Sequence, residues 1–161
     1  DLPDSVIEGG LSLGEHTITL EVNDGINEPL SADIDVTVID TEAPSISATA
    51  HPGILWPPNH KMVDVVVQAN ASDNSGEVTL SATVTSNNPP DAGGDGNTLA
   101  DYSEPVIDQE TGLITLELRA ERSGKGSGRT YTITVTATDD SGNSSDAVVE
   151  VVAPHDKGKK K

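Results

Sequence analysis

The side chains of this sequence that could do chemistry are mainly carboxylates. The chain has 27 Asp and Glu against nine Lys and Arg, and its net charge is −18 at pH 7. Carboxylates and amides gather in three segments far apart in the sequence, at Asp40, Glu42, Asp73, Asn74, Glu77, Asp139, Asp140 and Asn143. Bare carboxylates about 5 Å apart would repel each other by roughly 1–3 kcal/mol. Calcium accepts about six to eight such oxygens in loose geometry. The three segments therefore predict a calcium site if the fold brings them together.

A second group of oxygen ligands lies within residues 91–101. Its members are Asp91, Asp95, Asn97 and Asp101. Their spacing resembles the alternating ligands of a calcium loop, and the neighbouring glycines would allow a sharp turn. The closing bidentate Glu of an EF-hand is absent, so an ion site and an acidic surface turn both remain open. For each residue of both groups the alternative is a turn, because Asp and Asn bond their own backbone.

Other candidate chemistry is sparse. Trp56, in a Pro-rich loop, and Tyr102 could stack on a sugar, although we expect Trp56 to pack over the edge of the fold. Arg119, Glu121, Arg122 and Arg129 flank a Gly-rich hairpin, and an ion network with Asp64 is expected there. The four histidines are scattered and have no zinc-ligand spacing, and no Gly-x-Ser-x-Gly motif occurs. We therefore expect no enzymatic activity.

The elements that must position these residues are β-strands. An internal repeat matches residues 16–24 to residues 131–139, and residues 32–38 to residues 146–152, each copy being two strands around a Gly/Asn turn. Apolar residues alternate with Thr in these segments, which is typical of strands with one buried face. In the first copy the turn carries Asn23, Asp24 and Asn27, half of an ion site whose partners are missing.

Similar alternation predicts about seven strands in residues 42–154, separated by Gly, Asn, Asp and Pro turns. This pattern favours an all-β fold, an immunoglobulin-like (Ig-like) β-sandwich, with a barrel as the alternative. In such a sandwich the B–C and F–G loops lie at the end where the chain enters. That topology would bring the segments at residues 40–42, 73–77 and 139–143 to one place.

The pattern also predicts the domain layout. Residues 1–40 are expected to be a partial Ig-like module with closing strands only, residues 41–154 a complete sandwich, and residues 155–161 a basic disordered tail. The missing strands would come from preceding sequence, from the second module or from another molecule. The start at Asp1 suggests a mature or excised piece of a longer protein.

Charge and composition exclude several partners. Residues 1–156 hold five cations against 27 carboxylates, a net charge of −22, which repels nucleic acid and anionic membranes. The absence of Cys excludes disulfides and thiol catalysis. No run of about 18 apolar residues and no basic leader occurs, so neither membrane insertion nor a signal peptide is expected.

The junction Val38–Pro44 and the motifs at residues 55–62, 94–98, 118–124 and 152–156 add a resemblance. They resemble tandem extracellular Ig-like repeats of the hyalin-repeat (HYR), PKD and cadherin-like kind, with a C-terminal Ig-like module of bacterial secreted or surface proteins. The resemblance implies a non-enzymatic, calcium-stabilised structural or adhesion module, a spacer whose partners are neighbouring Ig-like modules of the same or another chain. The alternatives are a polysaccharide-binding accessory module and a surface-fibre subunit assembled by strand complementation.

Overall fold

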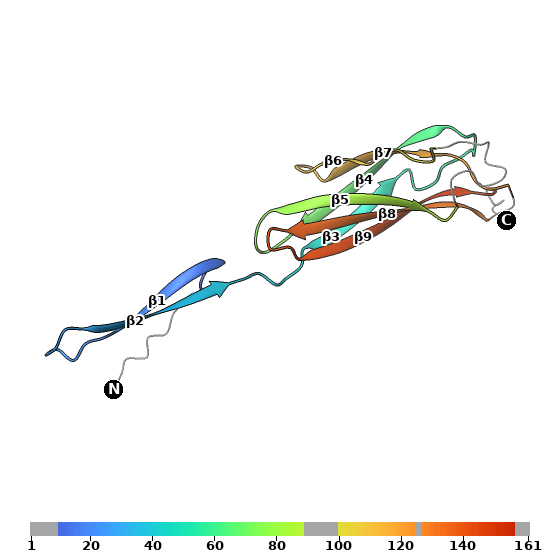
Figure 1. The fold of residues 1–161 in the computed structure, drawn as a ribbon. Coiled ribbons are helices and arrows are strands. Elements are labelled where there is room, and N and C mark those ends of the chain that lie inside the picture. The colour runs from blue at the N-terminus through green and yellow to red at the C-terminus, as the bar shows by residue number, and fades with distance from the viewer. Residues whose placement is uncertain (1–9, 89–99, 125–126, 157–161) are drawn as a thin grey trace, which may run out of the picture. The chain divides into compact units, whose positions relative to one another are not determined.

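The computed structural model describes residues 10–88, 100–124 and 127–156. In these ranges the chain forms nine β-strands and no helix, so the predicted all-β class is confirmed (Figure 1). The chain divides into two compact units, Asp1–Thr41 and Glu42–Lys161, close to the predicted boundary after residue 40. Residues 157–161 of the predicted tail lie outside the described residues. A helix long and apolar enough to cross a bilayer is not found in the described ranges.

The first unit is a β-hairpin. Strands β1 (Gly14–Val22) and β2 (Leu30–Val38) pair antiparallel, with Ile18 opposite Ile34. The polar face is held by side-chain hydrogen bonds, in which Thr17 donates to Asp35 at 2.9 Å and Thr19 donates to Asp33 at 2.7 Å. The period-2 pattern therefore places every apolar side chain of the hairpin on the opposite face.

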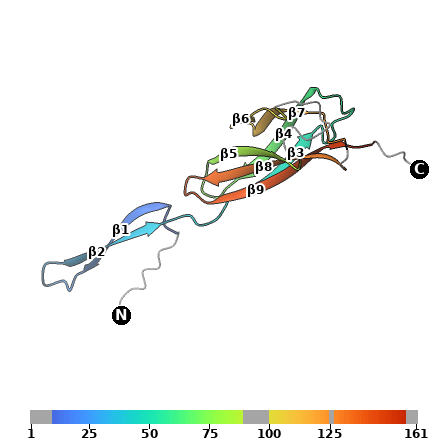
Figure 2. The ribbon, with the colours of Figure 1, turned by 45° about the vertical axis from the view of Figure 1, so that its right-hand side comes forward.

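The second unit is a sandwich of two antiparallel sheets. One sheet has the order β3-β4-β7-β6, made of Ser45–His51, Met62–Ser72, Leu113–Arg119 and Val106–Asp108. The other has the order β5-β8-β9, made of Val78–Ser86, Gly128–Asp139 and Ser144–Pro154. Figure 2 shows both sheets in a second view. These orders equal the ABED and CFG sheets of constant-type Ig domains, so the predicted sandwich is confirmed and the barrel is excluded.

The core of the sandwich lies between the two inner faces. Val65 and Ile114 from one sheet and Ile133 and Val135 from the other have no exposed surface. Near the start of β8, Tyr131 donates its phenolic O–H to the carbonyl of Arg119 at 2.8 Å. A tyrosine in this place joins strands E and F in Ig-like sandwiches. The described core therefore consists of Val, Ile, Leu and Ala side chains and one aromatic ring, as the composition allows.

The internal repeat is confirmed at the level of strand register, with one correction. His16 faces Val36 in the first hairpin and Tyr131 faces Val151 in the second, so both strands match at a constant offset of 115 residues. The predicted match of residues 32–38 to residues 146–152 is wrong by one position. The β1–β2 and β8–β9 turns have equal length, so the two hairpins align without a gap. Only this gapless alignment matches the apolar residues of β2 to the inward-facing residues of β9.

Candidate functional site

Two of the predicted ligands meet at one end of the sandwich. Asp73 follows β4, and Asp139 is the last residue of β8. Each offers a carboxylate oxygen, and these two atoms lie within 4.8 Å of one another. Asp139 is only 6% exposed, whereas Asp73 is half-buried. The Ig-like topology thus brings the B–C and F–G loops together, as the sequence pattern predicted.

Both carboxylates also brace their own turns. The backbone N–H and the hydroxyl of Ser75 donate to Asp73 Oδ1 at 2.8 and 2.5 Å. The backbone N–H of Asn143 donates to Asp139 Oδ1 at 2.8 Å, and its amide donates to Oδ2 at 2.9 Å. The turn alternative is therefore present at both positions. The bonds fix the direction of the two carboxylates without neutralising their charges, and oriented carboxylates are suited to an ion.

The other residues of the predicted cluster have different surroundings. Asn74 donates its amide to Glu42 Oε2 at 2.8 Å, which ties the first residue of the second unit to the B–C loop. Glu77 and Asp140 are exposed. Asp40 belongs to the first unit. Because it precedes Glu42 by two residues, the chain itself keeps their Cα atoms within about 7 Å.

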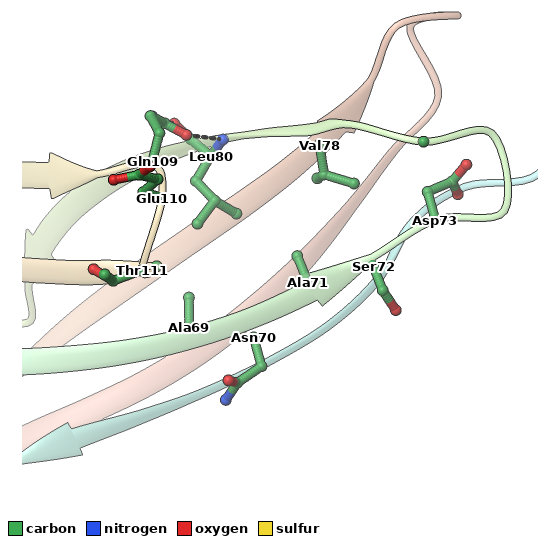
Figure 3. Close-up of a pocket in the computed structure, with 12 residues that line it drawn as sticks. Ala69, Asn70, Ala71, Ser72, Asp73, Val78, Leu80, Gln109, Glu110 and Thr111 are labelled. Carbon is green, nitrogen blue, oxygen red and sulfur yellow. Dashed lines mark hydrogen bonds between the residues drawn. The ribbon is translucent and has the colours of Figure 1, made fainter.

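Beside Asp73 the end of the sandwich is hollowed by a pocket (Figure 3). Asp73 lies at one end, and Gln109, Glu110 and Thr111 lie at the other. Leu80 N donates to Gln109 Oε1 at 2.9 Å, and Gln109 Nε2 donates to the Leu80 carbonyl at 2.8 Å. Gln109 thus links the two sheets and holds the edge of β5. Sequence reasoning missed this residue, since a lone Gln in a turn follows no periodicity.

The predicted loop site at residues 91–101 is described only at its end. Asp91, Asp95 and Asn97 lie outside the described residues. Asp101 is 4% exposed and forms an ion pair with the buried guanidinium of Arg129. Because a buried carboxylate next to an arginine already has its counter-charge, the structure gives Asp101 a role in the protein interior that the sequence did not predict.

Arg129 is the centre of the expected ion network. It has no exposed surface, lies 3.5 Å from Glu121 Oε1, and stands 5.8 Å from the centre of the Tyr131 ring. Burial, the largest effect, lowers the pKa of Arg129, but its contacts with Tyr131 and Asp101 outweigh burial and raise it overall. Arg119 approaches Glu121 at 4.0 Å.

His60 joins this network, which the sequence did not predict. Its Nδ1 lies 3.3 Å from Glu121 Oε2, and its carbonyl accepts from Arg119 Nη1 at 2.8 Å. The expected partner Asp64 is instead exposed and lies opposite Glu117 in the β4–β7 register. The correct partners come from distant loops, which strand alternation cannot pair.

The two candidate sugar-binding aromatics are partly exposed. Trp56 is 40% exposed and Tyr102 is 37% exposed. The residue that anchors the Trp56 loop is its neighbour Leu55, which is 1% exposed and donates its backbone N–H to Val152 at 2.9 Å. The expected packing of Trp56 over the sandwich edge is therefore partial.

In the first unit, Asp24 caps the β1–β2 turn. Backbone hydrogen bonds from Asn27 and then Ile26, with the Asn27 amide, lower the pKa of Asp24 to about 2. Asn23 accepts a bond from the backbone of Gly25 at 2.8 Å. The predicted half-site is thus a self-bonded turn.

No family model matches the sequence, and a search of curated proteins found no match. The geometry of the site therefore decides which chemistry it supports.

Proposed function

We propose that this chain is a calcium-stabilised, non-catalytic structural module that acts as a spacer in a secreted or surface protein. The observation that carries the proposal is the pair formed by Asp73 and Asp139, whose carboxylate oxygens lie within 4.8 Å of one another. A counter-ion is needed to balance two carboxylates at this distance, one of them buried. Nine Lys and Arg in the whole chain leave few cations to supply one.

Calcium suits the donors at this end of the sandwich. They are carboxylate oxygens on two turns, and calcium tolerates irregular arrangements of oxygen ligands better than magnesium does. Glu42 stands next to these turns through its bond with Asn74. An ion bound by Asp73 and Asp139, with Glu42 beside them, would stiffen the start of the second unit, which a spacer requires.

The test is the thermal stability of the full chain in EDTA and in millimolar calcium. An ion that binds only the folded state adds about 2.7 kcal/mol at a hundredfold excess over its Kd. For a unit of this size that corresponds to a rise in Tm of roughly 10 °C. Asp73→Ala and Asp139→Ala should each remove most of the calcium-dependent rise, whatever they do to the Tm in EDTA.

Asp108→Ala is the matched control. Asp108 is an exposed carboxylate that accepts turn bonds from the backbone of Glu110 and Thr111, so it shares the turn role but does not belong to the carboxylate cluster. Its loss should leave the calcium-dependent rise intact. Equal Tm values in EDTA and calcium would refute the proposal, and so would an equal rise with magnesium at the same concentration.

A further inference from the structure

The hairpin of the first unit exposes an apolar face. Leu20 is 66% exposed, Val22 is 56% exposed and Ile34 is 65% exposed, although all three lie on the same face as Ile18. The equivalent residues of the second unit, 115 positions later, are Val135, Ala137 and Val149. The first two have no exposed surface and Val149 is partly buried. The same sequence pattern in the same register is therefore covered in one unit and open in the other.

The second unit shows what covers such a face. The inner face of β8 and β9 packs against Val65, Val67 and Ile114 of the opposite sheet, and β5 pairs antiparallel along the outer edge of β8. In that pairing Val84 faces Ile133 and Ala82 faces Val135. By the offset of 115, a β5-type strand beside β1 would place these two residues opposite Ile18 and Leu20.

The outer edge of β1 has backbone groups suited to this pairing. In β8, the N–H and carbonyl of Thr130 both bond Asn87 after β5, whereas the N–H of Asp139 bonds Asn143 on the β9 side. Alternate residues of β8 therefore point to β5. The equivalents in β1 are Thr17, Thr19 and Glu21, and no described residue of the first unit pairs with this edge.

Charge selects among possible occupants. Residues 10–41 carry seven carboxylates and no Lys or Arg, so a second hairpin brought face to face would add a like charge. The strand that pairs with the equivalent edge in the second unit, β5 (Val78–Ser86), has no charged residue. An uncharged strand with apolar side chains at every second position fits both the edge and the face.

From these observations we infer that the first unit is a strand-binding surface, defined by the apolar face of Ile18, Leu20, Val22 and Ile34 and the outer edge of β1. Its ligand is an uncharged, alternating β-strand of a separate polypeptide segment, which pairs antiparallel with β1 in the register that β5 adopts on β8. Main-chain bonds supply the affinity, and the apolar side chains fix the register. This binding is independent of the proposed calcium site.

The experiment uses the ¹⁵N-labelled full chain in EDTA and a synthetic peptide with the sequence of residues 78–87 and blocked termini, which carries no charge. Amide exchange is followed by NMR. Peptide in excess should slow exchange at Thr17, Thr19 and Glu21 by roughly tenfold or more, while the amides of Ile18 and Leu20, which already face β2, change little. A peptide with Asp in place of Leu80 and Val84 should have no effect.

Two variants complete the test. Leu20→Asp on the apolar face should abolish the slowing, and Ser31→Asp, which adds the same charge on the polar face of β2, should preserve it. Continued protection of the amides that face β2 shows that the hairpin of each variant is folded. Unchanged exchange at saturating peptide would overturn the inference. Self-association with the same three amides protected before peptide is added would also overturn it, since a second copy would then be the occupant.

Discussion

The substitution Arg129→Met removes a cation that contacts two buried carboxylates. Asp101 and Glu121 are 4% and 0% exposed, and both lie against the Arg129 guanidinium. Removal of one partner from a buried ion pair costs about 3–5 kcal/mol, because the remaining charge stays desolvated. Glu121 retains Arg119 at 4.0 Å and His60 at 3.3 Å. We therefore expect the lower end of the range, about 3 kcal/mol.

The assay is urea unfolding followed by the fluorescence of Trp56, the single tryptophan, which lies in the second unit. A second variant combines Arg129→Met with Asp101→Asn, which removes the carboxylate charge left behind. If buried charge is the cause, the double variant should be more stable than the sum of the single effects by about 2 kcal/mol. A loss under about 1 kcal/mol for Arg129→Met, or strict additivity, would refute the reasoning.

Two further predictions concern aromatic residues. Burial raises the pKa of Tyr131 to about 12, which favours the protonated ring in the folded state. The contribution of Tyr131 to the free energy of unfolding is therefore complete below about pH 10. It should fall by about 2 kcal/mol between about pH 10 and 12, after allowance for screening. Tyr131→Phe should lack this slope in alkaline unfolding curves, and an unchanged slope would contradict the assignment. Trp56→Ala should cost about 2 kcal/mol, below the 3–5 kcal/mol of a fully buried ring, because the side chain is 40% exposed. Retention on insoluble polysaccharide should not change, and its loss at constant stability would indicate a sugar platform instead.

Strand periodicity determined most of the fold. Val63, Val65 and Val67, or Tyr131, Ile133 and Val135, alternate with polar residues, and a strand has only two faces, so the pattern alone sorts inside from outside. The positions of the turn residues then gave the number of strands. The known strand order of an Ig-like sandwich predicted that Asp73 and Asp139 would lie close together. The repeat itself was detectable from the sequence, whereas its alignment in the second strand required the observed pairing of His16 with Val36.

The sequence by itself determined the all-β class, the position of the boundary between the units and the acidic loops that lie at one end of the sandwich. The tertiary structure decided which charges pair. Asp101 is buried and pairs with Arg129. His60, and not the predicted Asp64, lies beside Glu121. Leu55, and not Trp56, is the buried residue of its loop. The physical reason is that alternation fixes the face of a strand residue, whereas loop residues have no period. A loop residue pairs with the groups that lie opposite it once the two sheets have packed, and only the tertiary structure defines those groups.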